Sequence, residues 1–188
     1  MRISAIAIVV ALFLWPAAVF GQSPELTDAF GSYEELYDQR RYHEALPFAE
    51  KALELGIREF GANHLHVGAF LNNLALVHAG LGHYADAELF HKRALTVNEH
   101  ALGPGHLNIA TSLDSLASLY QDQGRYAEAE PLYERALEIW EKALGPDHPD
   151  VALGLNNLAG LYDDQKCVSP LIRTKTSSRC QRQFEYGR

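Results

Sequence analysis

A repeat of 42 residues constrains what this chain can fold into more than any other feature of its sequence. The segments LNNLAL, LDSLAS and LNNLAG begin at Leu71, Leu113 and Leu155, so that each starts 42 residues after the one before. A fixed period between about 20 and 50 residues, with a helix pair in each unit, is typical of an α-solenoid. The sequence therefore predicts an all-α chain of stacked helical hairpins.

Within one unit, the apolar residues predict two helices joined by a tight turn. Leu113, Leu116 and Tyr120 follow helical spacing, Gly124 interrupts the pattern, and residues 126–144 resume it. Glycine suits the left-handed backbone conformation that commonly ends a helix. One such hairpin cannot bury its own apolar faces, and we therefore expect each hairpin to pack against its neighbours.

The period divides the chain into units of unequal quality. Residues 22–62 form a degenerate N-terminal capping repeat, with a weak first helix around 29–39 and a clear second helix over 42–60. Residues 63–104 and 105–146 form two complete repeats, and residues 147–165 form the first helix of an incomplete one. About three repeats and an extra helix are therefore expected.

The two ends of the chain depart from the repeat. Met1 and Arg2 precede a short apolar run and small residues, a pattern typical of a signal peptide over residues 1–21 that is cleaved after Gly21 or after Ala18. The alternative is an uncleaved membrane anchor. With cleavage, the protein is exported to the periplasm or the extracellular space and has no membrane association.

The segment 166–188 loses the repeat pattern and carries six basic residues against one acidic residue. We expect it to be disordered. It is either an unrelated tail or the product of a coding interruption such as a frameshift, and the abrupt change favours the interruption. Its two cysteines, Cys167 and Cys180, form a disulfide or remain free thiols.

The recurring order of motifs L-x-x-L-A-x-x-Y, G-x-Y-x-x-A, A-L and G-P-x-H resembles the tetratricopeptide repeat, in the 42-residue form of kinesin light chains. The resemblance covers about residues 33–165. It implies a right-handed superhelix in which the first helices of the repeats line a concave groove. Such a groove holds an extended peptide or a helix of a partner protein.

The resemblance also implies which side chains face this groove. An asparagine amide offers both a donor and an acceptor to a peptide backbone, whatever the sequence of the peptide. The alternative is that these are ordinary solvated residues of a helix face. The predicted groove residues are Asn72, Asn73, Leu76, Asp114, Ser115, Ser118, Gln121, Asn156, Asn157, Gly160 and Asp163.

Nine histidines raise the question of a metal site. His64, His106 and His148 follow the repeat, which puts them about 10 Å apart, too far for shared ligation at about 2 Å. A role in packing or hydrogen bonding at helix starts is expected instead. His64 and His66, or His78 and His83, could pair, but no carboxylate at a matched spacing and no third ligand is evident, and no metal site is predicted.

The remaining signals point away from catalysis and nucleic acid. The GxSxG, P-loop and CxxC motifs are missing, so that no enzyme activity and no cofactor are expected. Residues 22–165 carry 9 basic against 23 acidic residues, an excess that opposes binding to phosphate groups. The predicted function is a protein–protein interaction module. The alternative is a truncated fragment of a larger multidomain protein, in which the repeats regulate an attached enzymatic or signalling domain.

Overall fold

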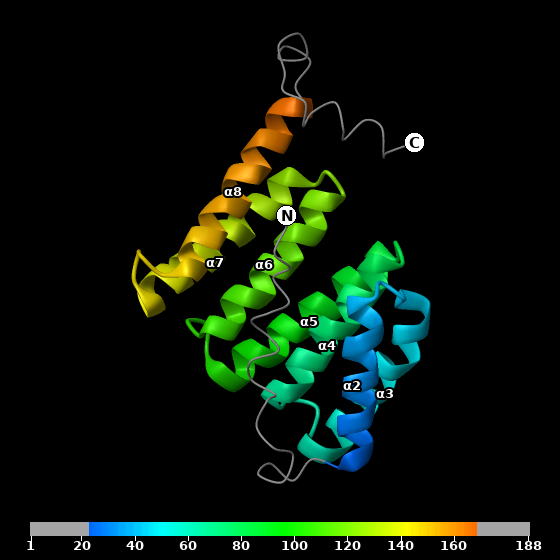
Figure 1. Cartoon of the computed structure of the whole chain (residues 1–188). Helices are drawn as coiled ribbons and strands as arrows, with labels where there is room; N and C mark the ends of the chain where they lie inside the picture. The colour runs from blue at the N-terminus through cyan, green and yellow to red at the C-terminus, as the bar shows by residue number, and fades with distance from the viewer. Residues whose placement is uncertain (1–22, 169–188) are drawn as a thin grey trace.

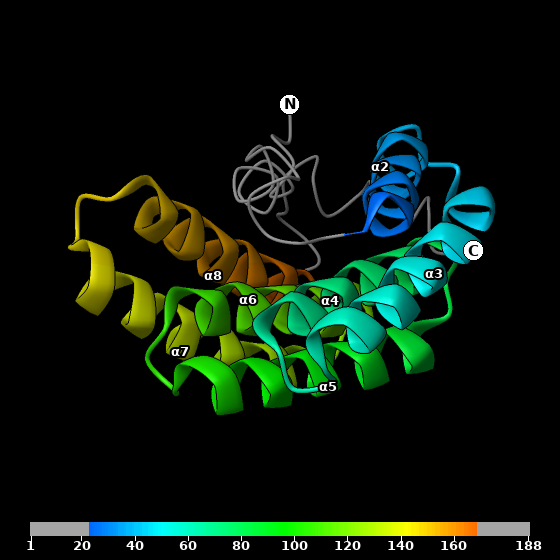
Figure 2. The ribbon, with the colours of Figure 1, turned by 90° about the horizontal axis from the view of Figure 1, so that it is seen from below.

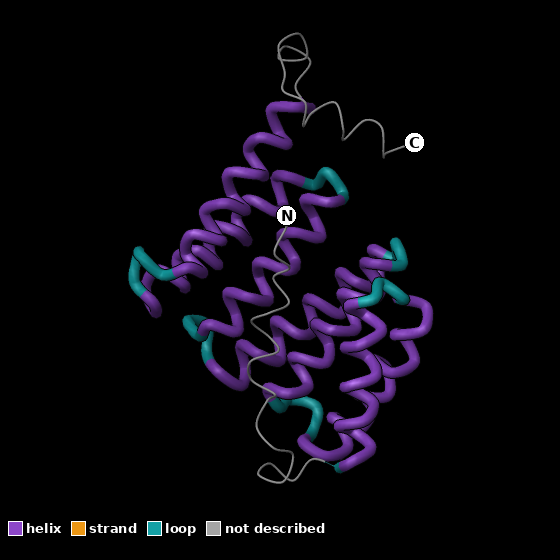
Figure 3. The backbone as a smooth tube through the Cα atoms, in the orientation of Figure 1, coloured by secondary structure: helices purple, strands orange, loops and turns teal. Residues whose placement is uncertain are grey.

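The computed structural model describes residues 23–168, and within this range the chain forms seven helices and no strand (Figures 1 and 3). No helix in this range is both long and apolar enough to cross a membrane. The predicted signal peptide, the segment 169–188 and both cysteine side chains lie outside the described part of the chain. The helices are α2 (Pro24–Asp38), α3 (Tyr42–Phe60), α4 (Leu65–Gly80), α5 (Tyr84–Leu102), α6 (Leu107–Asp122), α7 (Tyr126–Leu144) and α8 (Pro149–Val168).

The helices form antiparallel hairpins that lie side by side along the molecule. Each helix packs mainly against the helices before and after it in the sequence. In Figure 2, α2, α4, α6 and α8 lie on the inner side of a curved array, and α3, α5 and α7 lie on its outer side. The predicted all-α solenoid is therefore confirmed, and its first helices share one face.

Short turns with a left-handed residue join the two helices of each hairpin. Gly124 has a φ of 73° and Gly82, which is 42 residues earlier, has a φ of 77°, as predicted for the turn glycine. Arg40 occupies the equivalent position in the first hairpin and has a φ of 58°, a conformation that is uncommon for residues other than glycine. The turn geometry is therefore kept even where the glycine is not.

The helix bounds agree with the periodic pattern, with two differences, at α2 and at α8. Helix α8 runs to Val168, past residue 165, where the predicted last unit ends and the predicted tail begins. Helix α3 covers residues 42–60 as predicted, but α2 begins at Pro24 rather than near residue 29. The Ser23 hydroxyl accepts a hydrogen bond from the backbone N–H of Leu26, and Pro24 lies in the first helical turn. Both features favour a helix start, and they explain the earlier beginning.

Small residues at one repeat position allow the two helices of each hairpin to approach closely. Ala45, Ala87 and Ala129 are 42 residues apart and have no exposed surface. Large apolar side chains fill the space around them, and Phe70, Leu71 and Leu113 are at most 2% exposed. Burial of this apolar surface supplies the main stabilising free energy of the array and holds the first helices on the inner face.

Candidate functional site

Histidines position the starts of α4, α6 and α8 on the inner face. The Nδ1 atoms of His64, His106 and His148 accept hydrogen bonds from the backbone N–H two residues later, at 3.3, 3.1 and 3.2 Å. The first turn of a helix leaves N–H groups without a partner inside the helix, and each imidazole satisfies one of them. The predicted hydrogen-bonding role of these three histidines is thus confirmed.

Several of the predicted groove residues connect neighbouring first helices to one another. Asn157 Nδ2 of α8 donates to Asp114 Oδ1 of α6 at 2.8 Å, and Gln121 Nε2 of α6 donates to Asp164 Oδ2 of α8 at 2.6 Å. Gln121 also accepts a hydrogen bond from the Tyr133 hydroxyl at 2.9 Å. The bonds of Asn157 and Asp164 fix the spacing of α6 and α8, because both join residues from different repeats.

The predicted groove residues differ from one another in how far they are buried. Asn73 and Asp114 are buried, at 7% and 9% exposure, so little of either side chain is left to contact a partner. Their predicted role in the groove stays a prediction. The half-buried members are Asn72, Leu76, Ser115, Gln121, Asn157 and Gly160, whereas Ser118, Asn156 and Asp163 are exposed.

Asp114 carries an unusual carboxyl group for a helix face. Burial raises its pKa to about 6, although the hydrogen bond from Asn157 acts in the opposite direction. A carboxylate taken out of water loses hydration that one amide bond replaces only in part. The inner face therefore holds a carboxyl group that changes charge under mildly acidic conditions.

Asn72 belongs to a buried cluster between the second and third hairpins, which we name the polar cluster: Asn72, His91, Asn98 and Ser112. The Ser112 hydroxyl accepts from Asn72 Nδ2 and from Asn98 Nδ2, both at 3.1 Å, and His91 Nδ1 lies 3.1 Å from Asn72 Oδ1. His91 is 1% exposed, and burial lowers its pKa to about 4. The side chain of Asn72 is thus engaged inside the array.

A charged network lies beside the polar cluster and joins the same two hairpins. Arg125 Nη1 donates to Glu88 Oε2 at 2.6 Å, and the Tyr120 hydroxyl donates to Glu88 Oε1 at 3.0 Å. The hydrogen bond from Arg125 is the main reason that the pKa of Glu88 falls to about 2. The Tyr162 hydroxyl donates to Glu130 at 2.8 Å one period later, so that this tyrosine–glutamate contact repeats between hairpins.

Sequence reasoning missed two groups of residues. The polar cluster joins α4, α5 and α6, and its members show no spacing that marks them as neighbours. No carboxylate stands at a matched spacing from His78 and His83 in the sequence, but in the structure Asp86 lies with them at the turn between α4 and α5. A comparison of equivalent turn positions in successive repeats could have found this group.

Comparisons with known proteins agree with this architecture. Sequence models of the tetratricopeptide repeat family match residues 36–100 and residues 109–150. No curated protein sequence matches the chain.

The fold is similar to those of solved structures. One is a protein of Podosopora anserina, described as a kinesin light chain with nearly identical TPR-like repeats, at 21% identity and a TM-score of 0.68, over 77% of this chain and 69% of that chain. Another is BtubC of P. vanneervenii, at 24% identity and a TM-score of 0.62, over 82% of this chain and 62% of that chain.

Repeats of this family mediate protein–protein interactions and typically serve as non-enzymatic scaffolds. The matched segments cover both complete repeats and much of the first hairpin, and the helices follow the family's hairpin pattern. The chain is therefore a tetratricopeptide repeat protein, and its fold is that of kinesin light chain-like repeats.

Proposed function

We propose that this protein is an interaction module that binds a peptide or a helix of a partner protein along the inner face of α4, α6 and α8. The observation that carries the proposal is the set of exposed polar side chains on adjacent first helices. Ser118 of α6 and Asn156 of α8 are exposed, while the bonds of Asn157 and Gln121 hold these helices at a fixed spacing. A fixed spacing lowers the ordering cost of binding.

The charge of the chain favours a basic partner. Residues 22–165 have a large acidic excess, and Asp163 of α8 adds an exposed carboxylate near the inner face. Charge complementarity mainly raises the association rate, and it weakens as salt screens the charges. The same excess opposes binding to nucleic acid. We further propose that the protein is exported and that it catalyses no reaction.

A display library of short peptides tests the inner face directly. Peptides enriched on the wild-type protein are measured by fluorescence anisotropy against a Ser118→Arg/Asn156→Arg variant. Two bulky cations on the inner face should weaken binding by about tenfold or more, equivalent to about 1.4 kcal/mol. We also expect wild-type affinity to fall with added salt.

The matched control places the same charges on the outer helices. Thr96 of α5 and Ala143 of α7 are exposed, so a Thr96→Arg/Ala143→Arg variant adds two arginines away from the inner face. It should bind as the wild type does. Equal weakening in both variants, or binding that neither variant changes, contradicts the assignment of the inner face.

The alternative function, regulation of an attached domain, has one observation in its favour. Leu155 and Tyr162 of α8 are 50% and 36% exposed, and a further packed helix would cover side chains of this kind. If this apolar surface normally contacts another domain, a hydrophobic dye should bind the wild type more strongly than a Leu155→Gln/Tyr162→Gln variant. Equal dye binding by both proteins removes this support.

A further inference from the structure

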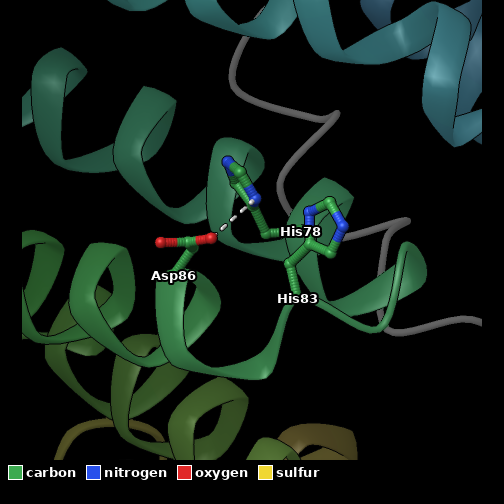
Figure 4. A group of neighbouring side chains, drawn as sticks. All are labelled: His78, His83 and Asp86. Carbon is green, nitrogen blue, oxygen red and sulfur yellow. Dashed lines mark ion pairs between the residues drawn. The ribbon is translucent and has the colours of Figure 1, made fainter.

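Three side chains of types that commonly bind metal ions in proteins lie together at the turn between α4 and α5. His78 comes from the last turns of α4, His83 directly precedes α5, and Asp86 lies in the first turn of α5 (Figure 4). One ligand atom from each residue lies within 4.8 Å of the other two. The group is distinct from the inner-face residues discussed above.

The imidazole of His78 has an unsatisfied nitrogen that faces Asp86. Its Nδ1 atom is buried and has no hydrogen-bond partner within the described part of the chain. The nearest opposite charge is Asp86 Oδ2, at 3.8 Å (Figure 4). This distance is too long for a hydrogen bond, but a cation bound at about 2 Å from each atom bridges it with little movement.

Aromatic contacts hold this imidazole in place. The ring of His78 stacks on Phe90, with centroids 5.3 Å apart and an angle of 26° between the rings, and its centroid lies 5.7 Å from that of His83. The backbone N–H of His83 donates to the His78 carbonyl at 2.8 Å, which fixes the turn. The His78 imidazole and the turn that carries His83 are therefore positioned before any ion binds.

The other hairpins show what this turn normally contains. At the positions of His83 and Asp86, the first hairpin has Arg41 and Glu44, and the third has Arg125 and Glu128. Both pairs form ion pairs, at 2.6 and 2.7 Å. Among the described residues no such pair joins His83 to Asp86. The second hairpin has thus replaced an arginine–glutamate pair by a histidine and an aspartate, and it has added His78 where the third hairpin has Tyr120.

We infer that His78, His83 and Asp86 bind a divalent transition-metal ion of the zinc type. Two imidazole nitrogens and one carboxylate oxygen suit Zn²⁺, Co²⁺ or Ni²⁺, whereas Ca²⁺ and Mg²⁺ prefer sites made of oxygen atoms. A tetrahedral ion would keep one position for water. Bound metal would tie the end of α4 to the start of α5, whereas each arginine–glutamate pair of the other hairpins lies within the start of the second helix.

The test is titration of the purified protein with ZnCl₂ by calorimetry, and with Co²⁺ by visible absorption. The variant His83→Arg/Asp86→Glu removes the His83 imidazole and engages the longer carboxylate in the ion pair of the neighbouring hairpins, and we therefore expect it to remain folded. The wild type should bind one ion per chain, and this variant should bind it at least tenfold more weakly. Binding should also weaken on acidification, because metal competes with protons for imidazole nitrogen.

A second histidine pair provides the control. His64 and His66 have ring centroids 4.9 Å apart at the start of α4, so they are the main competing ligands. A His66→Gln variant should retain the affinity of the wild type. Equal binding by the wild type and the His83→Arg/Asp86→Glu variant overturns the inference, as does loss of binding in the His66→Gln variant alone, or no binding of one ion per chain by the wild type.

Discussion

The three junctions between successive hairpins use the same two repeat positions in different ways. One position lies on the second helix of a hairpin and is occupied by Gly56, Asn98 and Trp140 in turn. The other lies on the first helix of the next hairpin and is occupied by Phe70, Ser112 and Gly154. The facing pairs are therefore glycine with phenylalanine, asparagine with serine, and tryptophan with glycine.

The two outer junctions combine an aromatic ring with a glycine, in opposite order. A Cβ atom on Gly56 would lie 2.5 Å from the ring of Phe70, and a Cβ atom on Gly154 would lie 3.0 Å from the ring of Trp140. Each glycine is required because the ring occupies the space that a side chain would need. Each outer junction thus contains one large ring and one glycine, and the two junctions differ in which helix carries the ring.

The middle junction replaces this apolar pair by the polar cluster. Asn98 and Ser112 are both buried and hydrogen-bonded, but Asn98 Oδ1 has no partner among the described residues. Buried hydrogen bonds contribute a modest net free energy, whereas an unsatisfied buried acceptor is unfavourable. The 42-residue period therefore determines the geometry of the array, while the junction residues determine how stably neighbouring hairpins pack against each other.

The largest expected effect comes from removing an aromatic ring at an outer junction. Phe70→Ala should lower the free energy of unfolding by about 3–5 kcal/mol, because it leaves a cavity beside Gly56 that backbone atoms cannot fill. Urea denaturation followed by circular dichroism measures the change. A loss below about 1 kcal/mol would show that this junction contributes no more than an exposed contact.

The second prediction concerns two buried groups, Asp114 and His91, whose contributions to stability change with pH in opposite directions. The folded state raises the pKa of Asp114 from 3.8 to about 6, so its contribution to stability falls as the pH rises through that range. The folded state lowers the pKa of His91 from 6.5 to about 4, so its contribution rises over nearly the same range. Each effect is worth about 3 kcal/mol, and the two largely cancel in the wild type.

Substituting one of these two groups at a time should reveal its contribution to the free energy of unfolding. Relative to the wild type, Asp114→Asn should gain stability as the pH rises from about 4 to 6, and His91→Gln should lose stability over the same range. The midpoints of urea denaturation, measured at several pH values for the three proteins, give these differences. The contributions of the other carboxyl groups are common to all three proteins and therefore cancel. Profiles that run parallel in all three proteins would contradict both assignments.

The smallest expected effect concerns the middle junction. Ser112→Ala removes the hydroxyl that accepts from Asn72 and Asn98, and leaves two buried amide groups with one partner fewer. The free energy of unfolding should fall by about 1–3 kcal/mol, less than for Phe70→Ala. Ser115→Ala is the control, because the half-buried Ser115 hydroxyl donates only to the backbone carbonyl of Thr111. A Ser112→Ala protein as stable as this control would show that the cluster contributes no net stability.

The sequence was sufficient for the fold because the 42-residue period repeats at residues that pack by size, such as Ala45, Ala87 and Ala129. Alanine at a helix crossing and glycine at a turn have local physical causes. The alanine is kept in all three hairpins, whereas Arg40 replaces the turn glycine in the first. The early start of α2 was missed although Ser23 and Pro24 carry an ordinary helix-start signal. Helix existence is thus better determined than helix bounds.

The candidate site was less predictable, since the fate of a polar side chain depends on partners from another repeat. Nothing at Asn72 itself shows that its amide bonds to Ser112, which lies 40 residues later and occupies a repeat position filled by Phe70 and Gly154 in the neighbouring units. The metal ligands were missed because His78, His83 and Asp86 span a turn and share no single helix face.

The histidine caps of α4, α6 and α8 make the starts of these helices depend on the tautomer of an imidazole, whereas the start of α2 does not. Each cap requires a lone pair on Nδ1, so the ring proton of the neutral imidazole must reside on Nε2. Ser23 caps α2 with a hydroxyl oxygen instead, so this tautomer requirement applies to α4, α6 and α8 and not to α2.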